Sequence, residues 1–420
     1  MKTIKINHIA KTEGHLSFVG AMLDNNFAQA HIETEEGARL IEGILLGRKY
    51  YEAPIITSRI CGVCPIVHNL TSIKAMESAL NVKVTPEIIL LRKILENAQI
   101  IHSHAIHAYF FSFPDIIGVS NNFNLINKFP KESKIALEVR DWGVQLARII
   151  GGRTVHPINS VIGGFNVEPD LKELDEFMAM KDEVLKKAAQ IYNFVIKYKL
   201  PKFQRPTNYV SLKSNSEYAV YDGKIYFSDN KSYDSAETFL RDVQEIVLPH
   251  EKVKRTQHLE RAFMVGALAR LNNSFDQLNP EAKKAWNKLK IKLPCYNSFY
   301  NILAQVVEIV NCIEELEKDY KLYKKISDKK LLVEVKPRSG KGYAVMEAPR
   351  GLLYHEYELN AQGNILHCNV ITPTAMFLAN LEKDLEQLLP QIKNYSDKKQ
   401  KDLIKTLIRA YDPCISCATH

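Results

Sequence analysis

The sequence predicts an α+β protein that is mostly helical, with small β-sheets at its periphery. Three observations indicate this class. Long segments repeat apolar residues with a helical period, the first 35 residues alternate like strands, and a stretch near residue 220 carries a hairpin pattern. The 420 residues contain no internal repeat and no low-complexity linker, so we expect one large domain over residues 1–420.

Composition and charge exclude several classes of protein. The chain is 46% hydrophobic and 25% charged, which is ordinary for a globular protein. Its net charge is +8, but lysines alternate with acidic residues along helical segments, so we expect no nucleic-acid surface. No apolar run approaches the ~20 residues that span a bilayer. The first 15 residues lack the apolar region of a secretory signal, which predicts a cytoplasmic protein without membrane insertion.

The N-terminal strands are expected over about residues 1–35. The segments IKINHIAK, HLSFVGAML and AQAHIETE each alternate apolar and polar residues, with a turn expected at residues 24–26. The next segment, GARLIEGILLGRKYYEAP, favours a single helix that ends at Pro54.

A helical core is expected over about residues 36–200 and 255–420. Thr85 and Pro86 form a typical helix start, with Thr85 as N-cap, and the apolar segment that follows predicts a long buried helix. Residues 171–200 predict a second long helix. In residues 302–323, apolar side chains recur in alternating steps of four and three, which is a heptad seam typical of a bundle helix.

A β-hairpin excursion is expected over about residues 205–230. The segment EYAVYDGKIYFSD has Asp222 and Gly223 where a tight turn would lie. The Asp-Gly pair favours the left-handed backbone of two-residue hairpin loops.

Seven cysteines indicate metal or redox chemistry, because an odd number in a chain without a secretory signal argues against a disulfide framework. Four of them form two C-x-x-C pairs, in RICGVCPIVH and DPCISCATH, about 350 positions apart. The other three are expected to be buried apolar side chains: Cys295, Cys312 and Cys368.

Two C-x-x-C pairs can converge on one metal ion. Structural zinc usually holds a local fold, with its pairs ~15–20 residues apart. The wide separation here favours a thiolate-bound transition metal in the core of the domain. Structural zinc and two unrelated redox dithiols stay open on spacing alone, and iron–sulfur ligands are usually more compact in sequence.

Charged residues in stretches rich in Gly, Pro and His point to catalysis. They are Glu13, Arg59, Asp115, Arg350 and Asp412. Simpler interpretations exist: the arginine of EAPRG suits a surface turn, His104 and His107 suit an exposed helical face, and His420 suits a frayed terminus.

Together these stretches resemble the large subunit of nickel–iron hydrogenases over nearly the whole chain. The central motifs are R-x-C-G-x-C-x-x-x-H and D-P-C-x-x-C-x-x-H, supported by KTEGH, GGRTVHP, VGALARLNN, EAPRG and ITPT. The resemblance implies a helix-rich fold around a central helical bundle. It also implies an enzyme that interconverts dihydrogen with two protons and two electrons.

The resemblance implies the metal ligands. Cys61 and Cys414 would be terminal thiolates on nickel, and Cys64 and Cys417 would bridge nickel to an iron that carries carbon monoxide and two cyanides. Further residues would surround this cofactor: His68, Pro349, Arg350, Pro373 and Thr374. Arg350 and Thr374 are in the positions from which the family donates hydrogen bonds to cyanide.

Catalytic roles follow from the same resemblance. Arg350 would lie over the open nickel–iron position and polarise dihydrogen as it splits heterolytically. Asp115 and Asp412 would orient Arg350 through hydrogen bonds. Glu13 would take the proton from Cys414.

A magnesium ion is implied as well, with Glu42, the backbone carbonyl of Val370 and His420 as ligands. Family precursors often carry a C-terminal extension that a maturation endopeptidase removes after this histidine. Because His420 is the last residue, the sequence has the form of a mature chain.

The resemblance also implies partners. Electrons would pass to an iron–sulfur small subunit, and from there to flavin or further iron–sulfur subunits that use NAD(P), a deazaflavin or ferredoxin. Ala375, Met376 and Phe377 after ITPT, together with Ser416, are most similar to the cytoplasmic, cofactor-linked branch. Alternatives are a hydrogen sensor with slow turnover, a structural zinc protein, and the metal-free relative in NADH:quinone oxidoreductase, against which the four cysteines argue.

Overall fold

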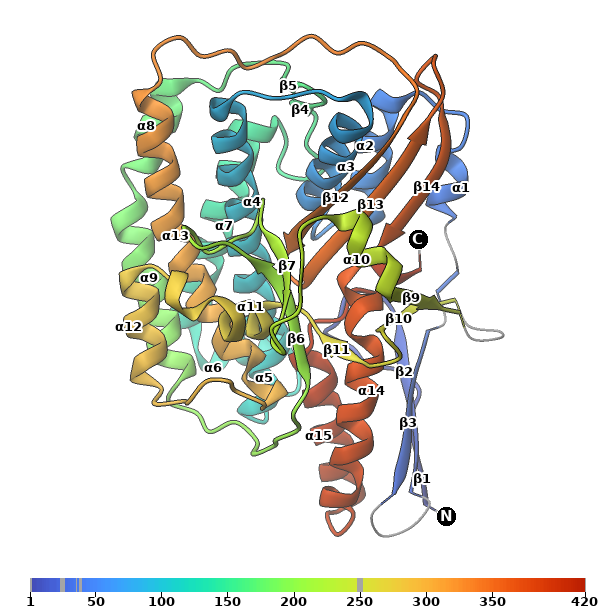
Figure 1. Cartoon of the computed structure of the whole chain (residues 1–420). Coiled ribbons are helices and arrows are strands. Elements are labelled where there is room, and N and C mark those ends of the chain that lie inside the picture. The colour runs from blue at the N-terminus through green and yellow to red at the C-terminus, as the bar shows by residue number, and fades with distance from the viewer. Residues whose placement is uncertain (1, 23–26, 35, 38–39, 248–251, 420) are drawn as a thin grey trace.

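The computed structural model describes residues 2–22, 27–34, 36–37, 40–247 and 252–419 (Figure 1). Helices dominate and the sheets have two to four strands, which confirms the predicted α+β class. Within these residues, every helix is too short or too polar to cross a lipid bilayer. Whether the chain is one domain stays a prediction.

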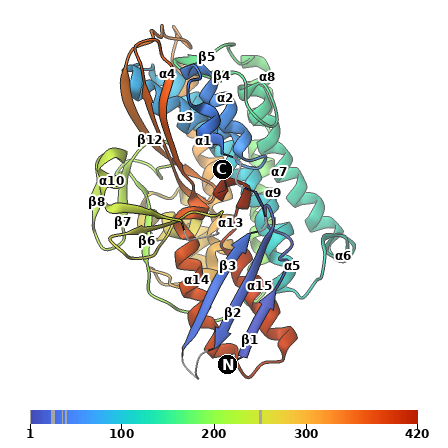
Figure 2. The same cartoon turned by 90° about the vertical axis from the view of Figure 1, so that its right-hand side faces the viewer.

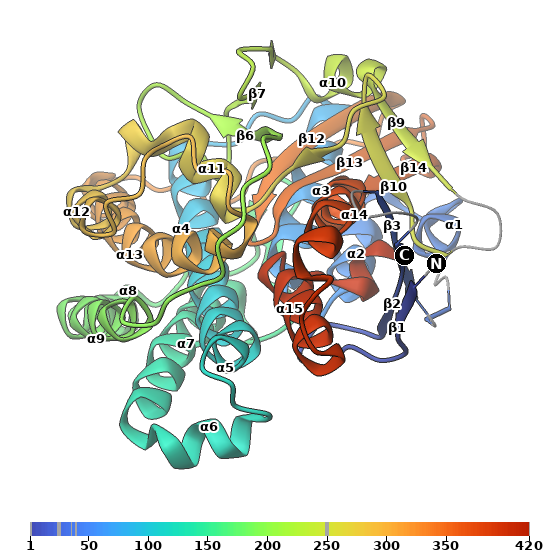
Figure 3. The same cartoon turned by 90° about the horizontal axis from the view of Figure 1, so that it is seen from below.

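Four helices form a bundle on one side of the molecule (Figures 1 and 3): α4 (Pro86–Ile106), α7 (Pro130–Gly151), α9 (Lys181–Val195) and α13 (Asn301–Lys325). α4 packs against α7 and α13, and α9 packs against the same two helices. The heptad seam of α13 is buried along its whole length, as a bundle helix requires. The predicted central bundle is therefore confirmed.

Helix α4 begins at Pro86 as predicted, but Thr85 does not cap it with its side chain. The Thr85 hydroxyl instead donates to the carbonyl of Lys330. The helical path continues through a π-helical turn, His107–Ser112, into α5 (Phe113–Ile116). The other helices around the bundle are α6 (Asn122–Lys128), α8 (Leu171–Met178), α11 (Ala267–Ser274), the 3-10 turn Phe275–Gln277 and α12 (Pro280–Lys288).

The predicted N-terminal strands are present as an antiparallel sheet: β1 (Lys2–Ile6), β2 (Leu16–Met22) and β3 (Ala28–Thr34), in chain order. The turn expected at residues 24–26 lies outside the described residues. Figure 2 shows this sheet beside α14 (Pro373–Ile392), which packs against β3.

The β excursion is present as an antiparallel pair of strands within residues 205–230, but the tight turn predicted at Asp222 and Gly223 is wrong. Strand β7 (Lys224–Phe227) follows Asp222 and Gly223, yet it pairs with β6 (Asn208–Lys213) instead of residues 217–221. The preceding segment is buried, and its Val220 carbonyl accepts the backbone N–H of Glu347. The sheet is completed by β8 (Ser232–Tyr233) and β11 (Phe263–Met264).

The remaining short elements are two separate strand pairs and one helix. They are β4 (Ser160–Val161) with β5 (Gly164–Phe165), β9 (Val243–Ile246) with β10 (Arg255–His258), and α10 (Ala236–Asp242).

A long antiparallel sheet carries the C-terminal part of the chain. Its strands are β12 (Gly340–Ala348), β13 (Gly351–Leu359) and β14 (Ile365–Ile371). Helix α3 (Pro65–Leu80) packs on β12 and β13. After β14 the chain forms α14, α15 (Asp397–Ala410) and the single turn α16 (Ile415–Ala418), so its end returns to the middle of the fold (Figure 2).

Two predicted helices are broken in the structure. The segment before Pro54 forms α1 (Ile41–Leu45) and a 3-10 turn (Tyr50–Glu52). It is followed by α2 (Ala53–Thr57), which contains Pro54, and by a second 3-10 turn (Ser58–Ile60). Gly47 has a left-handed backbone (φ 79°), and Pro54 lies in the first turn of α2, where its missing N–H costs no hydrogen bond. Residues 171–200 form α8 and α9, separated by Ala179 and Met180.

Candidate metal centre

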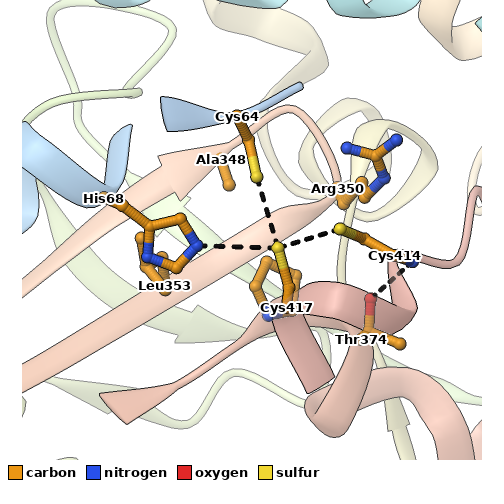
Figure 4. Close-up of a pocket in the computed structure, with 9 residues that line it drawn as sticks. Cys64, His68, Ala348, Arg350, Leu353, Thr374, Cys414 and Cys417 are labelled. Carbon is orange, nitrogen blue, oxygen red and sulfur yellow. Dashed lines mark hydrogen bonds between the residues drawn. The ribbon is translucent and has the colours of Figure 1, made fainter. Parts of the chain in front are cut away.

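The two C-x-x-C pairs meet in the core. The sulfurs of Cys61, Cys64, Cys414 and Cys417 all lie within 4.8 Å of one another, and each residue is buried. The sulfurs of Cys61 and Cys414 lie 3.4 Å apart. Those of Cys64 and Cys417 also lie 3.4 Å apart (Figure 4). With metal–sulfur bonds of ~2.3 Å, ligand sulfurs are roughly 3–5 Å apart, so this group fits a metal centre.

Helix starts place these cysteines. Cys64 is the N-cap of α3, and Cys414 is the N-cap of α16. The N–H groups of Val63 and Cys64 donate to the Cys61 sulfur at 3.2 and 3.4 Å, which folds the C-x-x-C segment around that sulfur. Backbone N–H groups at helix starts favour negative charge, and therefore thiolates.

The pKa values of the four thiols indicate that their thiolate forms repel one another. Burial raises the pKa of the Cys414 and Cys417 thiols, whereas the hydrogen bond from Cys414 lowers the pKa of Cys61. One thiolate therefore opposes ionisation of its neighbours. Four thiolates at this spacing require a cation to balance their charge.

A small cavity adjoins the sulfurs. It is lined by Cys64, His68, Ala348, Arg350, Leu353, Pro373, Thr374, Cys414 and Cys417 (Figure 4). Nη1 of Arg350 is buried, and among the described residues it has no hydrogen-bond partner. An unused donor beside four sulfurs fits a metal group that carries hydrogen-bond acceptors, such as cyanide nitrogens.

Arg350 is held by Asp412, as expected. It lies in the two-residue turn between β12 and β13, and its Nε donates to the carbonyl and to Oδ1 of Asp412 at 2.8 and 3.0 Å. Nη2 lies 2.9 Å from the same Oδ1. Burial alone would lower the pKa of the guanidinium, but Asp412 and the neighbouring thiols raise it, so Arg350 stays protonated.

The expected contact between Asp115 and Arg350 is wrong. The Asp115 carboxylate pairs with Lys11 at 2.5 Å and with Arg409. Asp115 lies in α5, beyond the π-helical turn. Lys11 binds its Oδ1 and Arg409 binds its Oδ2. Arg409 connects it only indirectly to the site, because the Arg409 carbonyl bonds to His107, whose ring lies 3.6 Å from Asp412.

Glu13 contacts the site directly. Its Oε2 accepts from the Cys414 sulfur and from the backbone N–H of Ser416, both at 3.0 Å. The Ser416 hydroxyl donates to Oε1. A backbone bond of 2.9 Å from Ile415 to the Glu13 carbonyl fixes the two segments together. The family resemblance implies this neighbour of Cys414, which is 401 positions away in the sequence.

Of the other expected cofactor-binding residues, three line the cavity: His68, Pro373 and Thr374. Thr374, in the first turn of α14, accepts the backbone N–H of Cys414 at 3.0 Å, next to Pro373. Nε2 of His68 lies 3.6 Å from the Cys417 sulfur. Pro349 does not line the cavity; its carbonyl accepts from Arg270 at 3.0 Å.

The expected magnesium ligands are brought together in part. Oε1 of Glu42 accepts the backbone N–H of Val370 at 2.8 Å, and both of its oxygens lie 3.2 Å from Nζ of Lys254. Lys254 also lies 3.3 Å from Glu245. His420 lies outside the described residues.

The interpretation of His104 and His107 as an exposed helical face is wrong. His104 and His107 are fully buried and face α13, where they bond at 2.7 Å to Glu308 and Gln305. Gln305 also donates to Asp412 at 3.3 Å, so α13 supports the residue that holds Arg350. Their spacing alone gave no means to identify these partners. The three single cysteines are buried, as predicted.

Comparison with known proteins agrees with this geometry. A family model described as nickel-dependent hydrogenase matches residues 39–142 and 250–420. Sulfhydrogenase 1 subunit alpha of Pyrococcus furiosus is 34% identical over 99% of this chain and 97% of its own length. The NAD-reducing hydrogenase HoxS subunit beta of Cupriavidus necator is 25% identical over 100% of this chain and 95% of its length.

The solved structures include an NAD⁺-reducing [NiFe]-hydrogenase in the H2-reduced state. It superposes with a TM-score of 0.90 at 23% identity, covering all of both chains, which shows the shared fold. The fold, the four-cysteine centre and these matches together place the chain in the nickel-dependent hydrogenase family, as a catalytic large subunit.

Proposed function

We propose that this hydrogenase subunit cleaves dihydrogen reversibly at the four-cysteine centre and passes the electrons to an iron–sulfur partner. The observation that carries the proposal is the convergence of four buried sulfurs, with Arg350 in the adjoining cavity and the Glu13 carboxylate on the Cys414 sulfur. A cation over the cavity and a carboxylate on one thiol are the two groups that heterolytic cleavage needs.

The bound nickel–iron group, with carbon monoxide and cyanide on iron, would supply the site at which dihydrogen splits. Cys61, Cys64, Cys414 and Cys417 would hold this group through their sulfurs. Nη1 of Arg350 would donate to one cyanide. The Thr374 hydroxyl accepts from Cys414 and would donate its own hydrogen to the other.

A magnesium ion near Glu42 belongs to the proposal, with the Val370 carbonyl and His420 as further ligands. Glu42 and Glu245 share one lysine, so this cluster carries excess negative charge. Carboxylates with excess negative charge suit a hard divalent cation. We also propose a maturation endopeptidase as a partner wherever the gene encodes an extension after His420.

The metal content can be measured directly. The purified complex should hold about one nickel and about one low-spin iron per chain, with infrared bands of carbon monoxide and cyanide. Cys417→Ala removes a ligand and should lose both metals and the bands. Cys312→Ala is the matched control, since Cys312 is equally buried but lies in α13. Zinc in place of nickel, without these bands, would refute the centre.

A separate subunit must receive the electrons. In the described part of the chain, the four cysteines are the only three or more His, Cys, Asp or Glu side chains whose ligand atoms converge on one point, so these residues offer no second redox centre. Beside that group, the surface over α1, α2 and the loop of residues 152–158 exposes apolar side chains: Ile44, Leu46, Tyr51, Ile55, Val155 and Ile158. We call this surface the α1–α2 face. His156 bonds to the Ser58 carbonyl at 2.8 Å, which ties the loop to the segment that leads into Cys61.

The proposed partner covers the α1–α2 face, where its nearest cluster would be close to Cys61. Ile55→Glu places a charge at the centre of this face and should reduce co-purification of the iron–sulfur subunit by roughly tenfold or more. Phe123→Glu is the control, since Phe123 is 81% exposed on α6, on another side of the molecule (Figure 3). Equal loss with both variants would place the partner elsewhere.

The onward acceptor is proposed to be NAD(P), a deazaflavin or ferredoxin, through flavin or further iron–sulfur subunits. The NAD-reducing relative supports the first of these. Because these acceptors are diffusible metabolic carriers, we propose a cytoplasmic complex. Sustained turnover of the purified complex with one of them would separate this enzyme from a hydrogen sensor, whose turnover is slow.

A further inference from the structure

Arg270 is buried and uses every donor that it has. It lies in α11, and its guanidinium contacts two carboxylates. Nε and Nη2 donate to Glu308 at 2.6 and 2.7 Å, and Nη1 donates to Glu347 at 2.8 Å. The two remaining N–H groups reach backbone carbonyls, those of Ala348 at 2.9 Å and Pro349 at 3.0 Å.

Those two carbonyls belong to the residues that precede Arg350. Arg270 therefore holds the turn between β12 and β13 by its backbone, from the side of α11 and α13. The residue before α11, Gly266, packs closely on the same turn. A Cβ added to Gly266 would lie only 3.0 Å from the Arg350 carbonyl oxygen. The turn has little room to shift away from the cavity.

We propose that Arg270 is a positioning residue, which fixes the turn of Ala348 and Pro349 and so sets where the Arg350 guanidinium stands beside the four cysteines. This inference rests on the proposed role of Arg350. It assigns Arg270 no contact with substrate or cofactor.

The ion pairs of Arg270 with Glu308 and Glu347 are better suited to fixing the position of the turn than to stabilising the fold. Burial opposes ionisation of Glu308, but the charge of Arg270 lowers its pKa to about 2, so the ion pair is intact. Burial raises the pKa of Glu347 to about 7 despite the same arginine. Buried ion pairs of this kind often add little net stability over apolar side chains, whereas their fixed geometry can specify one arrangement. Only a planar guanidinium has five donors in the required fork.

The test uses the complete complex with Arg270→Lys. Lysine keeps the charge but has three donors, so it cannot hold both carboxylates and both carbonyls. Metal content should stay, the cyanide bands should shift in the direction that we expect for Arg350→Lys, and kcat should fall about 10- to 100-fold because the guanidinium is displaced. The Arg270→Lys/Arg350→Lys double variant should be no slower than Arg350→Lys alone, because Arg270 acts through Arg350.

Arg92→Lys is the matched control. Arg92 is also fully buried and bonds to Glu77 at 2.6 and 2.9 Å, but its carbonyl partner is Val161. It should leave the cyanide bands in place, and its effect should multiply with that of Arg350→Lys. If Arg270→Lys does not fold, the isosteric Glu308→Gln loosens Arg270 and should shift the same bands by less.

Two results would overturn the inference: unshifted bands in the folded Arg270 or Glu308 variant, or losses that multiply in the double variant. Failure of this inference can be distinguished from failure of the proposed cofactor. If the proposed cofactor were wrong, the unmodified complex itself would lack carbon monoxide and cyanide bands.

Discussion

Arg350→Lys is expected to keep nickel and iron but to lower dihydrogen oxidation by orders of magnitude. Removal of one preorganised electrostatic group costs about 3–4 kcal/mol of transition-state stabilisation. Nε and Nη2 of Arg350 bind Asp412, while Nη1 remains for the cavity. A single ammonium cannot do both. Steady-state oxidation, metal analysis and infrared spectra of the purified complex would measure the result.

The two aspartates provide a sharper form of this test. Asp412→Asn keeps the backbone, since Asp412 has φ 55° and asparagine tolerates the left-handed region. It removes the charge that holds Arg350, so activity should fall substantially. Asp115→Asn should affect activity less, because Asp115 pairs with Lys11 and Arg409. Near-normal oxidation in Arg350→Lys would make Arg350 a structural turn residue.

The centre could be predicted from sequence because its geometry is local. In each C-x-x-C segment the helix start fixes both sulfurs, so only the meeting of two segments had to be inferred. Asp115 shows the limit of this reasoning. Its partner depends on how α5 leaves the π-helical turn and on cations from two other segments, and no spacing encodes that.

The buried polar cluster behind the site was also beyond sequence reasoning. Periodicity identified α13 as a bundle helix, but it could not show that Glu308 meets Arg270 or that His104 faces inward. The tight turn predicted at Asp222 and Gly223 failed for a related reason. Asp222 and Gly223 favour a turn locally, but tertiary contacts of the buried segment before them determine which strand pairs with β7.

Glu13→Gln is expected to separate proton movement from metal chemistry. The Glu13 carboxylate contacts Cys414 and is held by the backbone N–H of Ser416, so it is placed to take a proton from that thiol. Glutamine is nearly isosteric, and its carbonyl oxygen can still accept from Ser416. The Glu13 backbone contact to Ile415 does not depend on the side chain, so assembly of the site should survive.

An amide cannot accept and release a proton as a carboxylate can, so turnover of Glu13→Gln should fall about 10²–10⁴-fold. Exchange of dihydrogen with solvent deuterons should fall as well, because both processes need protons to leave the site, while the infrared bands stay. Ser416→Ala is the control: it removes one hydrogen bond to Glu13 but keeps the carboxylate, so its loss should be much smaller. Loss of nickel in Glu13→Gln would make Glu13 structural. Full solvent exchange with nickel retained would mean that protons leave Cys414 by a route that does not include Glu13.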